Sequence, residues 1–135
     1  MVDRVPSPAP AQNVRVGEHV LADIRGVGSK RLCDDRLLMS LLEQCLRQHG
    51  LRILQRTHHK FLSGGEGVTG MFLLAESHAC FHSYPEKGYV AVDVFACTAD
   101  SALSVVRDFA RALAAEETRL AKVDRPVTER FSRCV

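Results

Sequence analysis

The stretch from residue 67 to residue 97 constrains this chain more than any other part of its sequence. It holds three short apolar runs, residues 71–75, 79–81 and 90–96, bounded by glycine, serine and proline. Short runs with such boundaries are typical of strands. Polar residues interrupt or end these runs: Thr69, Glu76, Ser77, His78, His82, Glu86, Asp93 and Cys97. Because polar groups are costly to bury on a sheet, their concentration here indicates a functional site.

An amphipathic helix is expected on each side of this stretch. The first covers residues 37–46, where leucines recur at helical spacing between Asp34 or Asp35 as N-cap and Gly50 as stop. The second covers residues 103–113, with its cap at Asp100 or Ser101. Both apolar faces predict helices that pack on a core.

Further strands are expected at residues 14–24, at 51–57 and, more weakly, at 122–131. In the first of them, His19 is interpreted as a structural histidine. Helices separated by groups of strands indicate an α+β fold, a two-layer sandwich of a mainly antiparallel sheet with two helices on one face. The other face then needs a cover. A second copy of the chain is the simplest one, so a dimer or larger homo-oligomer, joined through the sheet or a sheet edge, is expected.

Length and composition limit the number of domains, the classes of partner and the cellular location that are expected. The 135 residues fit one domain, expected at residues 14–135 after a flexible, proline-containing tail at 1–13. The net charge of +2 gives no basic excess, so a nucleic-acid partner is not expected. No apolar run reaches the roughly 20 residues of a membrane span, and no signal peptide is recognised. A cytoplasmic protein without a membrane partner is therefore expected, and its five cysteines indicate reduced thiols.

The motifs of the central stretch form an ordered set. Glu76-Ser77-His78 is followed by His82, by Tyr84-Pro85-Glu86, by Gly88-Tyr89 and by a run that ends at Cys97, with Gly67-Val68-Thr69-Gly70 upstream. This set resembles that of the prokaryotic S-adenosylmethionine decarboxylase proenzymes, a pyruvoyl-dependent family. Weaker similarity extends from residue 17 to about residue 122.

The resemblance implies a chain that cuts itself between Glu76 and Ser77. The Ser77 hydroxyl would attack the Glu76 carbonyl to make an ester, and β-elimination would then leave a pyruvoyl group. This group would begin fragment 77–135, which stays with fragment 1–76. His82 would be the base, and Thr69, where the family has serine, would support the acyl shift. Regular strand alternation would place Ser77 and His82 on opposite faces, so a turn or kink is expected between them.

The resemblance also implies how a small-molecule substrate is handled. The covalent pyruvoyl cofactor would form a Schiff base with the substrate amine and accept electrons as CO₂ leaves. Cys97 would be the proton donor and Glu86 a substrate-binding acid. Tyr84, where the family has tryptophan, and Phe61, which corresponds to the aromatic residue that packs on adenine, would complete the binding site. The product would be decarboxylated S-adenosylmethionine for spermidine synthesis, and no residue is assigned as a metal ligand.

Three alternatives stay open. The same chemistry could act on arginine or ornithine, because Tyr84 and the glycine-rich loop at 63–67 both differ from the family where adenosine would be recognised. An inactive regulatory paralogue would bind a partner instead, although it would have no chemical reason to keep the reactive residues.

The third alternative is a zinc site. His78, Cys80 and His82 alternate along one strand and could present three ligands on one face, with Glu76 or Cys97 as a fourth.

Overall fold

The structure, a computed structural model, describes residues 14–98 and 100–127. The tail expected at 1–13 and the end of the strand expected at 122–131 lie outside these residues. The elements in chain order are β1 (Val14–Arg25), α1 (Ser29–Leu32), α2 (Asp35–Gln48), β2 (Ile53–Lys60), β3 (Val68–Leu74), β4 (Ser77–Tyr84), the 3-10 turn η1 (Pro85–Lys87), β5 (Tyr89–Ala96), α3 (Ser101–Ala112) and β6 (Glu117–Val127).

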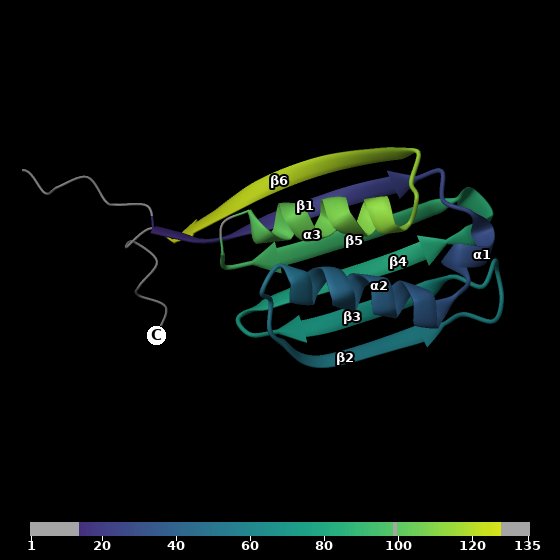
Figure 1. Cartoon of the computed structure of the whole chain (residues 1–135), viewed down its shortest axis with the longest axis horizontal. Coiled ribbons are helices and arrows are strands. Elements are labelled where there is room, and N and C mark those ends of the chain that lie inside the picture. Colours follow the sequence, from purple (N-terminus) through teal and green to yellow (C-terminus); the bar gives the residue numbers. More distant parts are fainter. Residues whose placement is uncertain (1–13, 99, 128–135) are drawn as a thin grey trace, which may run out of the picture.

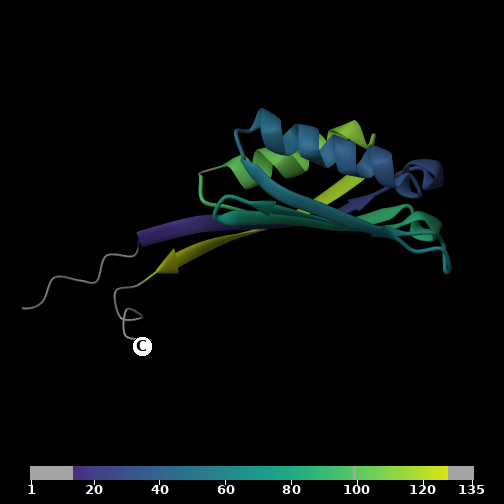
Figure 2. The same cartoon turned by 90° about the horizontal axis from the view of Figure 1, so that it is seen from below.

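The six strands form one antiparallel sheet in the order β2-β3-β4-β5-β1-β6 (Figure 1). Helices α2 and α3 lie over one face of it, and within the described residues no helix covers the other face (Figure 2). The expected two-layer α+β sandwich is therefore confirmed. The one-turn helix α1 is not predicted from the sequence, because four residues are too few to show a helical period.

Helix α2 begins as the sequence predicts. The Asp34 carboxylate accepts a hydrogen bond from the backbone N–H of Leu37 at 2.9 Å, and leucines on one side of the helix are buried against the sheet. Such capping satisfies one of the free N–H groups at a helix start.

Helix α3 begins differently. Asp100 holds the N-cap position but makes no side-chain cap bond. Glu18 of β1, whose side chain is fully buried, instead accepts from the backbone N–H of Leu103 at 3.4 Å. Arg15 and Lys122 lie 2.7 and 3.0 Å from its carboxylate. Burial alone would raise the pKa of Glu18, but the hydrogen bond from Lys122 and the backbone donors outweigh it and lower that pKa. Glu18 thus joins β1, β6 and α3.

Strand β4 is longer than the predicted run at 79–81. It runs without interruption from Ser77 to Tyr84, with strictly alternating burial. Ser77 and Phe81 face the helices, whereas His78 and His82 face the uncovered side. The kink expected between Ser77 and His82 is therefore absent.

The uncovered side of the sheet, here called the open face, carries large exposed apolar side chains. Leu21, Met71, Leu73 and Val123 are 45%, 51%, 53% and 47% exposed. Strand β6 closes one edge of this face, where Pro126 is tolerated because an edge strand need not donate every ladder bond. In the described part of the chain, no helix has the length and apolarity needed to cross a membrane.

Candidate functional site

Three predicted residues meet where β3 turns into β4. Glu76 occupies this turn with a left-handed φ of 60°, and Ser77 follows it with only 9% exposure. Cys97 arrives from the end of β5, the neighbour of β4 in the sheet. Its thiol lies 3.3 Å from the Ser77 hydroxyl and donates to the Glu76 carbonyl oxygen at 3.1 Å. These residues are here called the turn cluster.

The turn cluster has the geometry for chemistry on one peptide bond. A left-handed conformation costs a residue other than glycine roughly 1–2 kcal/mol, so the peptide after Glu76 is strained. Its carbonyl oxygen already accepts a hydrogen bond from a thiol, which favours negative charge developing on that oxygen. The hydroxyl of the next residue, Ser77, lies beside the same thiol.

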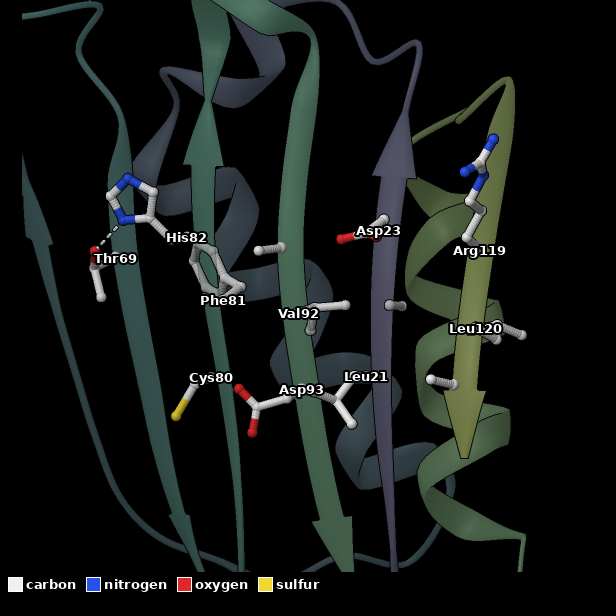
Figure 3. A pocket seen from close by; sticks show the side chains of 13 residues that line it. Leu21, Asp23, Thr69, Cys80, Phe81, His82, Val92, Asp93, Arg119 and Leu120 are labelled. Carbon is white, nitrogen blue, oxygen red and sulfur yellow. Dashed lines mark hydrogen bonds between the residues drawn. The ribbon is translucent and has the colours of Figure 1, made fainter. Parts of the chain in front are cut away.

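A second group lies farther along the same hairpin. Thr69 and His82 are direct cross-strand neighbours on β3 and β4, and a hydrogen bond of 2.5 Å joins Thr69 Oγ1 to His82 Nδ1 (Figure 3). The His82 ring lies between two aromatic rings, with centroid distances of 5.7 Å to Phe61 and 4.5 Å to Tyr84. The imidazole is therefore held in one orientation.

The predicted substrate-binding residues gather around this histidine. Phe61, Tyr84 and Glu86 line a hollow of about 200 Å³ together with His82 and the glycines of the preceding loop. Here it is called the His82 pocket. Phe61 is 41% exposed, so one ring face is free to contact a ligand. Sequence reasoning thus named side chains that the fold brings together.

A larger hollow of about 500 Å³ opens on the open face beside His82 (Figure 3). Its floor includes Ala91, which stands between His82 and Asp23 in the strand register. Because alanine is short, the floor is low there. Tyr89 donates to Asp23 at 2.6 Å, and this hydrogen bond, helped by burial, raises the pKa of Tyr89 to about 12. The sequence does not point to Ala91 and Asp23, since only the pairing of β1 with β5 reveals them.

The turn cluster and the His82 pocket are not brought together within one chain. Ser77 and His82 face opposite sides of a regular strand. They are five residues apart, and at about 3.3 Å per residue the separation along the strand is about 17 Å. The expectation that a turn or kink unites them is wrong for a single chain.

The zinc alternative raised from the sequence is also wrong about which residues come together. His78, Cys80 and His82 share the open face, but the first and last of them are about 13 Å apart along the strand, and the three ligand atoms do not converge within 4.8 Å of one another. Burial, and then the charge of Asp93, raise the pKa of the Cys80 thiol. His78 instead forms a hydrogen bond with Asp93, which also bonds His19. His19 therefore has a side-chain partner, as its interpretation as a structural histidine expects.

The chain is similar to several known proteins. Residues 18–126 match the family profile described as S-adenosylmethionine decarboxylase. The S-adenosylmethionine decarboxylase proenzyme of Caldanaerobacter subterraneus is 34% identical over 116 residues, 85% of this chain and 92% of the relative. The proenzyme of Parasynechococcus marenigrum is 38% identical over 101 residues, 72% of this chain and 77% of the relative.

A third relative and a solved structure extend the comparison. The proenzyme of Prochlorococcus marinus is 38% identical over 82 residues, 61% of this chain and 66% of the relative. The crystal structure of the adenosylmethionine decarboxylase from Aquifex aeolicus superposes with a TM-score of 0.79 at 27% identity, covering 88% of this chain and 98% of that one.

Proposed function

Because the chain belongs to the S-adenosylmethionine decarboxylase family, as its central motifs predicted, we propose that it decarboxylates S-adenosylmethionine after cutting itself between Glu76 and Ser77. The observation that carries this proposal is the turn cluster. The Cys97 thiol bridges the Ser77 hydroxyl and the Glu76 carbonyl oxygen, and self-cleavage must join that hydroxyl to the carbon of the same carbonyl group.

The residues present fit a pyruvoyl group made from Ser77. The required serine follows a strained peptide, and the carbonyl of that peptide is already polarised by a hydrogen bond. The group would supply an electron sink when the substrate loses CO₂. Cys97, an exposed thiol at the same place, would hold the proton that returns to the α-carbon of the substrate.

The chain's own residues would carry out the cleavage. Oγ of Ser77 forms a bond to the carbonyl carbon of Glu76, the C–N bond between them breaks, and an ester results. Cys97 stabilises the negative charge on the carbonyl oxygen during this step. A base then removes the Cα proton of residue 77, the carboxylate of Glu76 leaves, and residue 77 becomes dehydroalanine. Its imine tautomer would be hydrolysed by water, which releases ammonia and gives the pyruvoyl group. His82 suits this task, because a ring nitrogen of imidazole can accept a proton and Thr69 orients the ring.

We propose that His82 acts on the Ser77 of a second copy of the chain. The separation of about 17 Å within one chain excludes direct contact. The open face also exposes Leu21, Met71 and Leu73, and exposed apolar side chains of this size favour burial in an interface. An antiparallel two-fold arrangement of two open faces would bring the start of β4 in one copy, where the turn cluster lies, over the end of β4 in the other copy, where His82 lies.

The His82 pocket supports S-adenosylmethionine as the substrate. Its aromatic side chains, Phe61 and Tyr84, offer faces for a nucleobase, and the Glu86 carboxylate offers acceptors for ribose hydroxyls. The three relatives described above are named for S-adenosylmethionine, and none of them is named for arginine or ornithine. The product would serve spermidine synthesis, as the family resemblance implies.

Intact-mass spectrometry after expression tests the cleavage. We expect two fragments, divided between Glu76 and Ser77, and one uncut chain for Ser77→Ala. Ser40→Ala, a change to an exposed serine of α2, is the matched control and should be cut normally. Release of labelled CO₂ from S-adenosylmethionine, arginine and ornithine, measured side by side, tests the substrate. An uncut wild-type chain, or release from arginine or ornithine alone, would contradict the proposal.

A further inference from the structure

Three potential metal ligands converge on the open face, outside both groups described above. Nε2 of His19 and Nε2 of His78 lie 3.0 and 3.2 Å from the same carboxylate oxygen, Oδ2 of Asp93. All three ligand atoms lie within 4.8 Å of one another. In the part of the chain that the structure describes, this is the single group of three or more such residues with that spacing. It is here called the His–Asp–His cluster.

The sheet holds the cluster in place. Phe95 of β5 is the register partner of both His78 on β4 and His19 on β1. Its ring packs against the two imidazoles at centroid distances of 5.8 Å and 5.9 Å. Asp93 lies two residues before Phe95 on the same side of β5, where both histidines reach it. Three adjacent strands therefore orient the ligands before any ion binds, which limits the entropy lost on binding.

The spacing suits a small divalent cation. Zinc binds imidazole nitrogen at about 2.0–2.1 Å and carboxylate oxygen at about 2.0–2.2 Å, so tetrahedral ligands stand roughly 3.3 Å apart. The observed 3.0 and 3.2 Å are close to this value. We propose that His19, His78 and Asp93 supply three ligands to one zinc-type divalent cation per chain.

One neighbouring positive charge should affect the affinity of this site for a cation. Nη1 of Arg125 lies 3.5 Å from Nδ1 of His19, and its guanidinium stands 5.6 Å from the Phe95 ring centroid. A cation on Nε2 of His19 would be repelled by it. Arg125 is exposed, so its side chain is free to turn away. Removing this charge should therefore strengthen metal binding, whereas loss of a ligand should weaken it.

Calorimetric titration of Zn²⁺ into the untagged, chelator-treated full chain tests the proposal, with Co²⁺ as a spectroscopic probe. We expect one saturable site per chain and Co²⁺ absorption typical of nitrogen and oxygen ligands. Ser77→Ala should bind equally, which separates this proposal from the self-cleavage. His19→Gln, His78→Gln and Asp93→Asn should each weaken binding by more than about 100-fold, because loss of even an outer partner costs 10- to 100-fold.

Two further variants complete the test. His58→Gln removes a histidine that pairs with one aspartate, Asp35, and should bind Zn²⁺ like the wild type. Arg125→Gln should bind severalfold more tightly, which keeps the proposal testable if a ligand variant fails to fold by circular dichroism. Absence of saturable binding, unchanged affinity in folded ligand variants, weaker binding by Arg125→Gln, or a sulfur-to-cobalt charge-transfer band would each overturn it.

Discussion

The two-copy arrangement can be tested by placing its two halves on different chains. Ser77→Ala lacks the nucleophile but keeps His82, and His82→Ala lacks the base but keeps Ser77. Each variant expressed alone should stay uncut. When both are expressed together in equal amounts, a mixed pair contains one complete site, built from Ser77 of one chain and His82 of the other.

The expected size of the effect follows from the geometry and from random pairing. A base must come within about 3 Å of the proton that it removes, and Ser77 and His82 of one chain are about 17 Å apart along β4. Cleavage should therefore depend wholly on the other copy. Random pairing puts about half of the His82→Ala chains in mixed pairs, so about half of these chains should be cut.

A matched experiment tests for loss of cleavage in wild-type chains. A chain carrying both substitutions, expressed with an equal amount of wild type, should leave about half of the wild-type chains without a partner base. Different short tags distinguish the two chains, and intact-mass spectrometry measures the cut fraction of each. If the separate variants yield no cut chain together, and the double variant leaves wild type fully cut, then His82 acts within its own chain or not at all, and the two-copy site is refuted.

Three further outcomes are expected. Thr69→Val, which loses the hydrogen bond to His82, should slow cleavage about tenfold in a mass-spectrometric time course, and Thr69→Ser should restore it. Glu18→Gln should lower the free energy of unfolding by about 1–3 kcal/mol at pH 7. Because the folded pKa of Glu18 is lowered, its stabilisation is present above its unfolded pKa and is lost as pH falls through the folded value. The urea unfolding free energies of the two proteins should therefore converge as pH falls from the ordinary glutamate pKa through the lowered pKa of Glu18, and a constant difference would contradict this reasoning. Gly70→Ala should cost about 1–3 kcal/mol in the same assay, since its new methyl group would overlap the Phe81 ring.

Much of the fold follows from local sequence patterns. The leucine period predicts α2, and Asp34 caps it as expected, because capping and amphipathicity act within one or two turns. The apolar runs of the central stretch predict its strands in order, although the run at 79–81 is shorter than β4. Polar residues flank this run, which made it look short. Side chains alternate between the two faces of a strand, so Ser77 and His82 occupy opposite faces of one unbroken strand. Family motifs named the residues of the turn cluster and of the His82 pocket without any geometry.

What the sequence could not decide is which of these residues meet. Cys97 reaches Glu76 and Ser77 because β4 and β5 pair in one particular register, and His19 reaches Asp93 through the pairing of β1 with β5. Buried Glu18 replaces the expected cap of α3 for the same reason. Strand registers join residues far apart in the chain, and they are set by packing of the whole core and not by neighbours in sequence. The sequence alone therefore determined the chemistry available to this protein, and the tertiary structure decided how that chemistry is divided between two ends and two faces of one sheet.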